Sequence, residues 1–307
     1  MAIIFFGTPD FAVPSLTALI ETKEHVDLVV TQPDRVKGRG HVLSAPPVKE
    51  FALSCGISVL QAEKIHSQEF YHELTGYAPE FIIVVAFGKI LPRNILHLPV
   101  RGCINVHASL LPKYRGAAPI QWSLLKGERI TGVTSMLMDE GLDTGDILLQ
   151  SALEIDENDN SATLFARLAD LGAKTLIATL RGIRAGCIKP IPQVGEASFA
   201  PPLRKADGRI DWRKSAEELV FFIRGMNPWP SAVCFIGSER IKITKARAVA
   251  GNGEPGRIEK TSGGTLLVGT LKGLLMVEEL QPEGKRAMPA AAFLAGRKLK
   301  EGHEKFS

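Results

Sequence analysis

The sequence has few of the features on which secreted, membrane-spanning or metal-binding proteins depend. Its cysteines, Cys55, Cys103, Cys187 and Cys234, lie far apart, and no two have the spacing of metal ligands or of a redox pair. A reduced, cytoplasmic protein is therefore expected. No apolar run approaches the roughly 20 residues that span a bilayer. The run at 2–6 is too short for a signal peptide and lacks basic residues before it, so we expect a first strand and no membrane association.

The glycine fingerprint of dinucleotide-binding proteins is missing as well. Residues 10–21 carry apolar side chains at near-helical spacing, so the sequence predicts a helix directly after the first strand. The turn between them, Gly7-Thr8-Pro9, has a single glycine. We therefore expect no nicotinamide or flavin cofactor.

Net charge is low in the chain as a whole but not in its parts. The 307 residues carry a net charge of +4. Residues 1–203 hold 18 Lys and Arg against 21 Asp and Glu, a net charge of −3, whereas residues 204–307 hold 19 against 12, a net charge of +7. Such a split suggests that the C-terminal part meets a polyanion; the alternative is a basic surface without a partner.

Strands and helices alternate in the first part of the chain. Apolar runs predict buried strands at 2–6, 26–31, 81–87, 103–107 and 132–138, and helical spacing predicts helices at 10–21, 48–55, 69–75, 117–126 and 161–184. This order is typical of an α/β domain with an open, mostly parallel sheet of Rossmann-like type.

A second domain is predicted after a proline-rich stretch. Residues 190–207 hold four prolines and little periodicity, which indicates a linker between domains at 1–189 and 208–307. A capping box at Ser215 and Glu218 begins a helix. The short strands that follow indicate a small antiparallel β-barrel, OB-like and of the kind that binds oligonucleotides, although other small β domains share the pattern.

Polar side chains gather where two of the predicted strands end. Asn105 and His107 lie two apart near the end of a strand, and so on the same face. Strand 132–138 runs into a loop rich in glycine and acids that contains Asp143 and Asp146. Because open α/β sheets keep their sites where strands end, we expect the two loops to meet. Residues 87–91, which follow another apolar strand, are either a wall of the same pocket or an ordinary turn.

Three of these side chains suit acyl transfer. Neutral His107 can accept or relay a proton near pH 7, Asp143 can orient it, and the Asn105 amide can donate to an oxyanion. The alternative is that they only satisfy backbone groups of turns. A metal site with Asp146 is a third reading, but no second histidine or cysteine lies at ligand spacing, so no metal is expected. Ser109 lacks the glycines of a nucleophile elbow and is not expected to form an acyl-enzyme.

Residues 32–49, QPDRVKGRGHVLSAPPVK, form an unusually long predicted connection. It carries five basic side chains, Arg35, Lys37, Arg39, His41 and Lys49, against one acid. Loops of this length inside a compact domain are usually functional or disordered. The charge favours contact with phosphate, and the alternative is a solvated basic loop.

Several motifs carry a resemblance to a known family. They are GTPDF (7–11), TQPDR and GRG (31–35 and 38–40), VVAFGKILP (84–92), INVHASLLPKYRGAAPIQWSLLKGE (104–128), TGVTSMLMDEGLDTGDI (131–147), RIDW (209–212) and NPWP (227–230). Together they resemble the folate-dependent formyltransferase family over both predicted domains.

The resemblance implies transfer of a formyl group from 10-formyltetrahydrofolate, as co-substrate, to the α-amino group of methionine esterified to initiator tRNA, in translation initiation. Asn105, His107 and Asp143 match the family's catalytic residues in the roles given above. The implied folate contacts are Phe87, Gly88, Lys89, Ile90, Leu91, Ser109, Leu110, Leu111, Pro112, Met138, Asp139 and Gly141. The implied tRNA contacts are Arg35, Lys37 and Arg39, in the family's basic inserted loop, together with the basic C-terminal barrel. A cytoplasmic monomer is expected.

Other acceptors and one other class of protein remain as alternatives. Family members that act on a glycinamide ribonucleotide resemble only the N-terminal half. Members that act on an amino-sugar nucleotide have a second domain but no loop like PDRVKGRG, and they are the principal alternative. A catalytically silent RNA-binding protein of the same fold would not need a base and its orienting acid.

Overall fold

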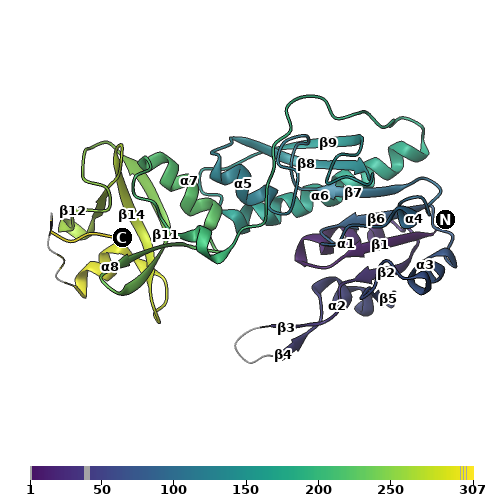
Figure 1. Cartoon of the computed structure of the whole chain (residues 1–307), viewed down its shortest axis with the longest axis horizontal. Helices are drawn as coiled ribbons and strands as arrows, with labels where there is room; N and C mark the ends of the chain where they lie inside the picture. Colours follow the sequence, from purple (N-terminus) through teal and green to yellow (C-terminus); the bar gives the residue numbers. More distant parts are fainter. Residues whose placement is uncertain (1, 38–41, 298, 300, 302) are drawn as a thin grey trace. The chain divides into compact units, whose positions relative to one another are not determined.

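The computed structural model describes residues 2–37, 42–297, 299, 301 and 303–307. The chain divides into two compact units (Figure 1). The N-terminal unit comprises Met1–Pro119, Ile130–Glu154 and Phe165–Ala200, and the C-terminal unit comprises Ile120–Arg129, Ile155–Leu164 and Pro201–Ser307. Each unit therefore contains segments that are not contiguous in sequence.

Within the described residues, the N-terminal unit is built on a seven-stranded sheet in the order β5-β2-β1-β6-β7-β8-β9. Its strands are β1 (Ile3–Gly7), β2 (Val26–Thr31), β5 (Ser58–Gln61), β6 (Phe81–Val85), β7 (Cys103–His107), β8 (Ile130–Leu137) and β9 (Ile147–Glu154). The first five strands in this order, β5, β2, β1, β6 and β7, are parallel. Strand β8 runs antiparallel to both of its neighbours, β7 and β9. The predicted α/β domain with a mostly parallel sheet is confirmed.

The helices of this unit follow the predicted order. They are η1 (Asp10–Ala12), α1 (Val13–Glu21), α2 (Pro47–Ser54), α3 (Gln68–Thr75), α4 (Arg93–Leu96) and α6 (Ser161–Arg184), whose first residues belong to the C-terminal unit. Helix α5 (Pro119–Leu125), also predicted, belongs to the C-terminal unit except for Pro119. The short α4 was not predicted. The long connection contains a hairpin of β3 (Arg35–Lys37) and β4 (Val42–Ser44), which the sequence also did not predict.

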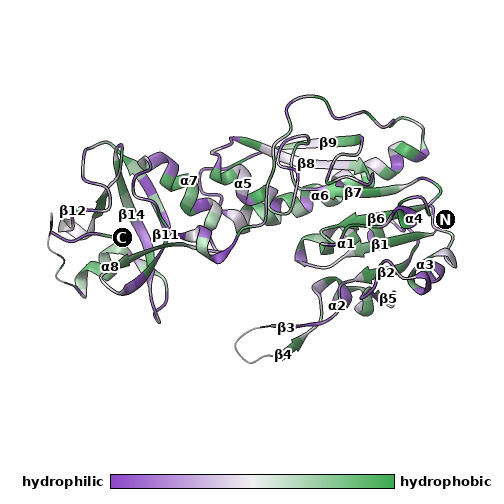
Figure 2. Cartoon of the chain, in the orientation of Figure 1, coloured by the Kyte–Doolittle hydropathy of each residue, from purple (hydrophilic) through white to green (hydrophobic). Residues whose placement is uncertain are grey.

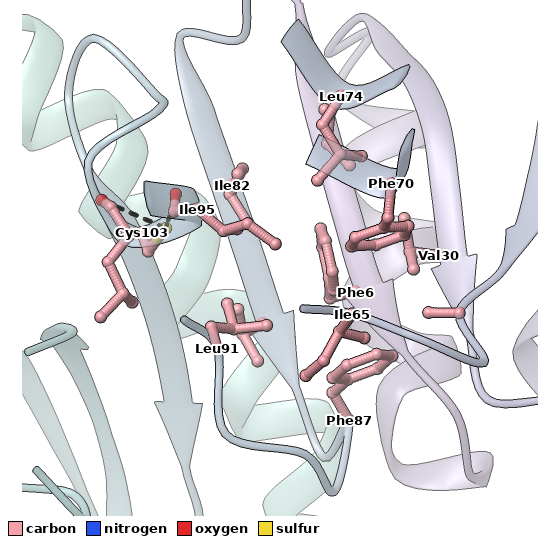
Figure 3. Close-up of a cluster of buried hydrophobic side chains, with 14 of the residues drawn as sticks. Phe6, Val30, Ile65, Phe70, Leu74, Ile82, Phe87, Leu91, Ile95 and Cys103 are labelled. Atoms are coloured by element: carbon pink, nitrogen blue, oxygen red, sulfur yellow. Dashed lines mark hydrogen bonds between the residues drawn. The ribbon is translucent and has the colours of Figure 1, made fainter. Parts of the chain in front are cut away.

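The core of the N-terminal unit lies around its central strands. Strands β1 and β6 are buried along their whole length, as their continuous apolar sequences require, and Figure 2 shows them in the hydrophobic colour. One cluster of buried side chains includes Phe6, Phe70 and Phe87, and the Phe6 ring lies 5.0 Å from that of Phe87 in an edge-on arrangement (Figure 3). The segment that follows β6 contributes Phe87 and Leu91 to this cluster.

Helix α6 ends in an ionic network around the buried carboxylate of Glu80. The Arg184 guanidinium donates to the Glu80 carboxylate, with Nη2 2.8 Å from Oε2, and to Glu24, with Nη1 2.8 Å from Oε1. The Arg101 side chain contacts Glu80 at 3.0 Å, and Glu80 is 1% exposed. The hydrogen bonds that Arg184 donates to the Glu80 carboxylate, together with those it donates to Glu24, raise the pKa of Arg184 above its ordinary value. The network fixes the end of α6 to the start of β6.

The C-terminal unit carries an antiparallel sheet in the order β10-β11-β14-β13-β12, with β15 paired to β14. Its elements are η2 (Lys205–Gly208), α7 (Ala216–Met226), β10 (Ala232–Ile236), β11 (Glu239–Val249), β12 (Ile258–Lys260), η3 (Ser262–Gly264), β13 (Leu266–Gly269), β14 (Leu274–Pro282), β15 (Met288–Pro289) and α8 (Ala290–Ala295). The predicted capping box at Ser215 and Glu218 is present. The predicted small β domain is confirmed as an antiparallel half-barrel; β12, β15 and α8 were not predicted.

Residues 304–307 lie between the two edges of this half-barrel. Phe306 bridges to Ile236 of β10, and Lys305 bridges to Arg257, which precedes β12. The Phe306 ring is 1% exposed and stacks on Trp212 at 5.6 Å. This segment therefore links strands β10 and β12.

The four cysteines are free thiols. Cys55 and Cys187 are exposed thiols, and Cys103 and Cys234 are buried thiols, with no disulfide among these four. Burial raises the pKa of the Cys103 thiol to about 12. None of the helices in the described ranges combines the length and apolar character needed to cross a membrane.

Candidate active site

The structure brings together the three side chains assigned to catalysis. Asn105 and His107 lie on β7, and Asp143 lies in the loop between β8 and β9. Asn105 Nδ2 is 3.4 Å from Asp143 Oδ1, and His107 Nδ1 is 3.7 Å from Asp143 Oδ2. Because β8 runs antiparallel to β7, its end at Leu137 lies beside Ile104 at the start of β7, and the loop after β8 reaches back along β7 to place Asp143 beside Asn105 and His107. The two loops do meet, since Asp143 also accepts a hydrogen bond from Gly116 of the loop after β7, but the carboxyl ends of β7 and β8 lie at opposite ends of the strand pair, contrary to the reason given for the prediction.

The orientation of the His107 ring is determined by a backbone carbonyl. Nε2 lies 2.9 Å from the carbonyl oxygen of Tyr114, and the side chain is 7% exposed. A carbonyl only accepts hydrogen bonds, so Nε2 must carry a hydrogen. In the neutral ring the other nitrogen, Nδ1, is then the basic one, and it faces Asp143. Tyr114 was not among the predicted site residues.

Asp143 adopts a backbone conformation that few residues other than glycine tolerate. Its φ is 52°, and aspartate is one of the exceptions that visit this region. Its Oδ2 accepts a hydrogen bond of 2.8 Å from the backbone N–H of Gly116. Gly116 has a φ of 120°, and a Cβ there would lie 2.8 Å from the Ala200 carbonyl oxygen. Only glycine can therefore present its N–H to Asp143 at this point.

Residues 191–200, inside the stretch predicted to be a linker, contact both loops of the site. Gln193 Nε2 donates to the carbonyl oxygens of Asp143 and Gly145, both at 2.8 Å. Ser198 Oγ accepts from the backbone N–H of Tyr114 at 2.9 Å. Gln193 and Ser198 lie in a proline-rich stretch without periodicity, so no sequence signal pointed to them.

The predicted folate segment 109–112 is held against β8. Ser109 is fully buried, and its hydroxyl donates to the Lys113 carbonyl oxygen at 2.6 Å, which fits a structural rather than a nucleophilic serine. Thr134 Oγ1 donates to the Ser109 carbonyl oxygen at 2.7 Å and accepts from the Leu111 N–H at 3.0 Å. Leu110 packs against Gly132, and Pro112 follows a cis peptide bond.

The predicted folate segment 87–91 has its apolar side chains turned toward the core. Phe87 and Leu91 are buried in the cluster of Figure 3, whereas the Ile90 side chain is 71% exposed. The Phe87 carbonyl oxygen accepts from Gln32 Nε2 at 2.7 Å, and Lys89 Nζ donates to the Ala62 carbonyl oxygen at 2.6 Å. Gly88 has a φ of 77°. A ligand would thus meet Ile90 and backbone groups of this segment.

The predicted folate residues at the start of the acidic loop are ordered by local hydrogen bonds. Met138 packs against the same core cluster as Phe87 and Leu91. Asp139 Oδ1 accepts from the Gly141 N–H at 3.0 Å and from Thr144 Oγ1 at 2.8 Å. These bonds give the loop a defined shape ahead of Asp143.

An ion pair between Asp34 and Lys49 joins the two ends of the basic connection 32–49. Lys49 Nζ lies 2.9 Å from both Asp34 carboxylate oxygens, and its hydrogen bonds hold the pKa of Asp34 below its ordinary value. Arg35 is exposed and donates to Gln32 Oε1 at 2.5 Å. The Lys37 side chain and all of Arg39 lie outside the described residues. Their contacts with tRNA stay predictions.

In the described part of the chain, no group of three or more His, Cys, Asp or Glu side chains is placed to hold a metal ion. The suggested grouping of His107, Asp143 and Asp146 is not among such arrangements.

The chain matches two family models and a full-length relative. The model described as formyl transferase matches residues 1–180, and that described as formyl transferase, C-terminal domain, matches residues 202–298. The chain is 54% identical over 305 residues to the methionyl-tRNA formyltransferase of Thermodesulfovibrio yellowstonii, with 99% of each sequence covered.

Two solved structures share the fold at lower identity. The N-formyltransferase from Helicobacter canadensis, solved with folinic acid and dTDP-3-aminofucose, is 19% identical, with a TM-score of 0.67 over 90% of this chain and 98% of its own. HypX from Aquifex aeolicus, in complex with tetrahydrofolic acid, is 18% identical, with a TM-score of 0.64 over 97% of this chain. This chain spans 48% of the HypX chain.

Proposed function

The chain belongs to the formyltransferase family, and we propose that it transfers the formyl group of 10-formyltetrahydrofolate to the α-amino group of methionyl initiator tRNA. The observation that carries this proposal is the identity of 54% to a methionyl-tRNA formyltransferase over 99% of both sequences. The products are formylmethionyl-tRNA and tetrahydrofolate. We expect the enzyme to act as a monomer in the cytoplasm, where translation begins.

The acceptor is favoured over an amino-sugar nucleotide by the relatives. The sugar-nucleotide enzyme shares the fold at 19% identity, whereas the tRNA enzyme shares 54% of its residues with this chain. The net charge of +7 in residues 204–307 also suits a polyanionic acceptor. An enzyme for an amino-sugar nucleotide remains the alternative.

The reaction requires three tasks that match the side chains of the site. The acceptor amine attacks the formyl carbon, whose oxygen becomes an oxyanion, and the amine then loses a proton while the bond to folate N10 breaks and N10 gains one. Asn105 carries two amide hydrogens, so one can face Asp143 while the other donates to the oxyanion. His107 accepts the proton through Nδ1, because Nε2 is committed to the Tyr114 carbonyl. Asp143 stabilises the resulting imidazolium.

Folate is assigned to segments 87–91, 109–112 and 138–141. The support is that Met138 shares a core cluster with Phe87 and Leu91, and that segment 109–112 is fixed to β8 beside the strand that carries His107. The exposed Ile90 side chain offers an apolar contact for the pterin ring. Backbone groups of these segments would pair with its polar edge.

We expect the KM for methionyl-tRNA to rise with salt concentration and the KM for folate to change little. Release of counterions from phosphates should raise the KM for methionyl-tRNA at least about tenfold between 50 and 200 mM salt. The substitution Arg35→Met should reduce the slope of log KM against log salt by about one. The measurement is steady-state formylation at several salt concentrations.

The matched control is Lys174→Met, which removes an exposed positive charge from α6. It should leave the slope unchanged. Two results would contradict the assignment of the β3–β4 hairpin to tRNA. One is that the KM for folate and the KM for tRNA depend equally on salt; the other is that the Arg35 variant keeps the original slope.

A further inference from the structure

Gln193 lies outside the catalytic strands but contacts the loop that carries Asp143. Its Nε2 is 2.8 Å from the carbonyl oxygens of Asp143 and Gly145. Its Oε1 accepts from Arg115, at 2.7 Å from Nη2 and 3.2 Å from Nε. We propose that Gln193 is a positioning residue for Asp143; this inference rests on the proposed function.

The orientation of the Gln193 amide is unambiguous. Carbonyl oxygens only accept and the guanidinium of Arg115 only donates, so the NH2 group must face the loop and the oxygen must face Arg115. Both amide hydrogens and the oxygen have partners at hydrogen-bond distance. No other residue type can make this set of contacts at the same length, because glutamate lacks the donors and methionine lacks both groups.

The two carbonyls that Gln193 holds lie on either side of Thr144. The φ of Asp143 is 52°, a sparsely populated conformation that persists only when surrounding contacts support it. Gly145 permits no substitution, because a Cβ there would lie 1.8 Å from the Leu137 carbonyl oxygen. Hydrogen bonds at both carbonyls therefore fix the backbone at the point where the Asp143 side chain leaves it.

The same short segment holds Asp143 a second time. Arg115 orients Gln193, and the next residue, Gly116, donates its N–H to Asp143 Oδ2 at 2.8 Å. The main chain of Asp143 is thus linked through Gln193 to Arg115, and its carboxylate is bonded directly to the next residue, Gly116. The carboxylate lies 3.7 Å from His107 Nδ1, and a small displacement of the loop would change that distance. Gln193 acts on the reaction through Asp143 and does not touch the substrate.

The test is Gln193→Met, which keeps the length of the side chain and removes its hydrogen bonds. We expect kcat for formylation to fall about tenfold or more, because misplacement of a catalytic group by about 1 Å can cost as much as 10²-fold. The KM for 10-formyltetrahydrofolate should change less than about twofold. Glu196→Met, an exposed position in the same segment, is the control and should keep the original kcat.

A double-mutant cycle separates positioning from a general structural role. If Gln193 acts through the Asp143 carboxylate, adding Gln193→Met to Asp143→Asn should lower kcat by less than about twofold. Two results would overturn the inference. One is that Gln193→Met lowers kcat tenfold both in the unmodified enzyme and in Asp143→Asn; the other is that it leaves kcat unchanged and raises only the KM for folate. If the methionine variant does not fold, Gln193→Glu replaces it, since it keeps the contact with Arg115 and places an oxygen against the two carbonyls.

Failure of the inference can be told from failure of the proposed function. If Gln193→Met retains full kcat while His107 and Asp143 variants lose theirs, only the role of Gln193 is wrong. If the unmodified protein does not formylate methionyl-tRNA, the proposed function is wrong, and the cycle is then run with the acceptor that the protein does formylate.

Discussion

Replacing His107 with alanine should lower kcat for formylation by a factor on the order of 10² or more, because general base catalysis typically contributes 10²-fold to 10⁴-fold. Of the three side chains proposed for catalysis, only His107 is an imidazole, the group best suited to accept the amine proton and release it afterwards. Its Nδ1 faces Asp143 and its Nε2 is held by the Tyr114 carbonyl. The measurement is single-turnover formylation with saturating folate and tRNA.

Binding of the two substrates should survive this change. The ring is 7% exposed and its polar contacts are within the protein, so the Kd of a tetrahydrofolate should shift by less than about threefold while turnover collapses. The control His72→Ala removes an exposed histidine from α3 and should keep normal turnover. Unchanged turnover in the His107 variant would remove it from the mechanism.

Replacing Arg184 with methionine should lower the free energy of unfolding by about 1.5–3 kcal/mol, the usual contribution of hydrogen bonds to a charged group, because the buried Glu80 carboxylate loses one of its two cationic partners. Glu80 is 1% exposed and would retain only the contact with Arg101, whose side chain is 39% exposed. The measurement is equilibrium denaturation by urea, with the slope of the transition compared between variants.

Two further variants identify the cause. Arg181→Met, one turn earlier on α6, removes an exposed charge and should change the stability by less than about 0.5 kcal/mol. Adding Glu80→Leu to the Arg184 variant should recover a large part of the loss, because the apolar pair no longer contains a buried charge that has lost part of its hydrogen bonding. Equal losses for Arg181 and Arg184 would show that the network adds nothing to stability.

The architecture was predictable where the sequence has a strong period. Continuous apolar runs identified β1 and β6, since strands covered on both faces need no polar positions. The 24 residues of α6 were predicted at the observed bounds because their apolar stripe repeats over several turns. The hairpin β3–β4 was not predicted, because three-residue strands leave no period to detect.

The strand that carries Asn105 and His107 was predictable, but the residues that support the candidate site from outside it were not. Asn105 and His107 stand out because two polar side chains on one face of an apolar strand require a reason. Gln193 and Ser198 contact the site from a segment 50 or more residues away that has no regular structure. Contacts of this kind depend on tertiary placement, and a proline-rich composition indicates only the absence of helix and strand.

The folate segments illustrate a second limit. The resemblance assigned Phe87 and Leu91 to the pocket, but their side chains are buried in the core and only Ile90 of that segment is largely exposed among the apolar members. A motif records which residues accompany a function, without separating those that contact a ligand from those that hold the contacting backbone in place. Substitution of the buried Phe87 would therefore lower stability, whereas substitution of the exposed Ile90 would weaken folate binding.

The most direct measurement is a formylation assay with two parallel reactions. Both contain the protein and 10-formyltetrahydrofolate; one contains charged methionyl initiator tRNA as acceptor, and the other contains an amino-sugar nucleotide. Formyl transfer is followed by release of tetrahydrofolate and by recovery of the formylated acceptor. We predict formylation of the tRNA-bound methionine, its loss in the His107→Ala variant, and no formylation of the sugar. Formylation of the sugar nucleotide alone would contradict the proposed function.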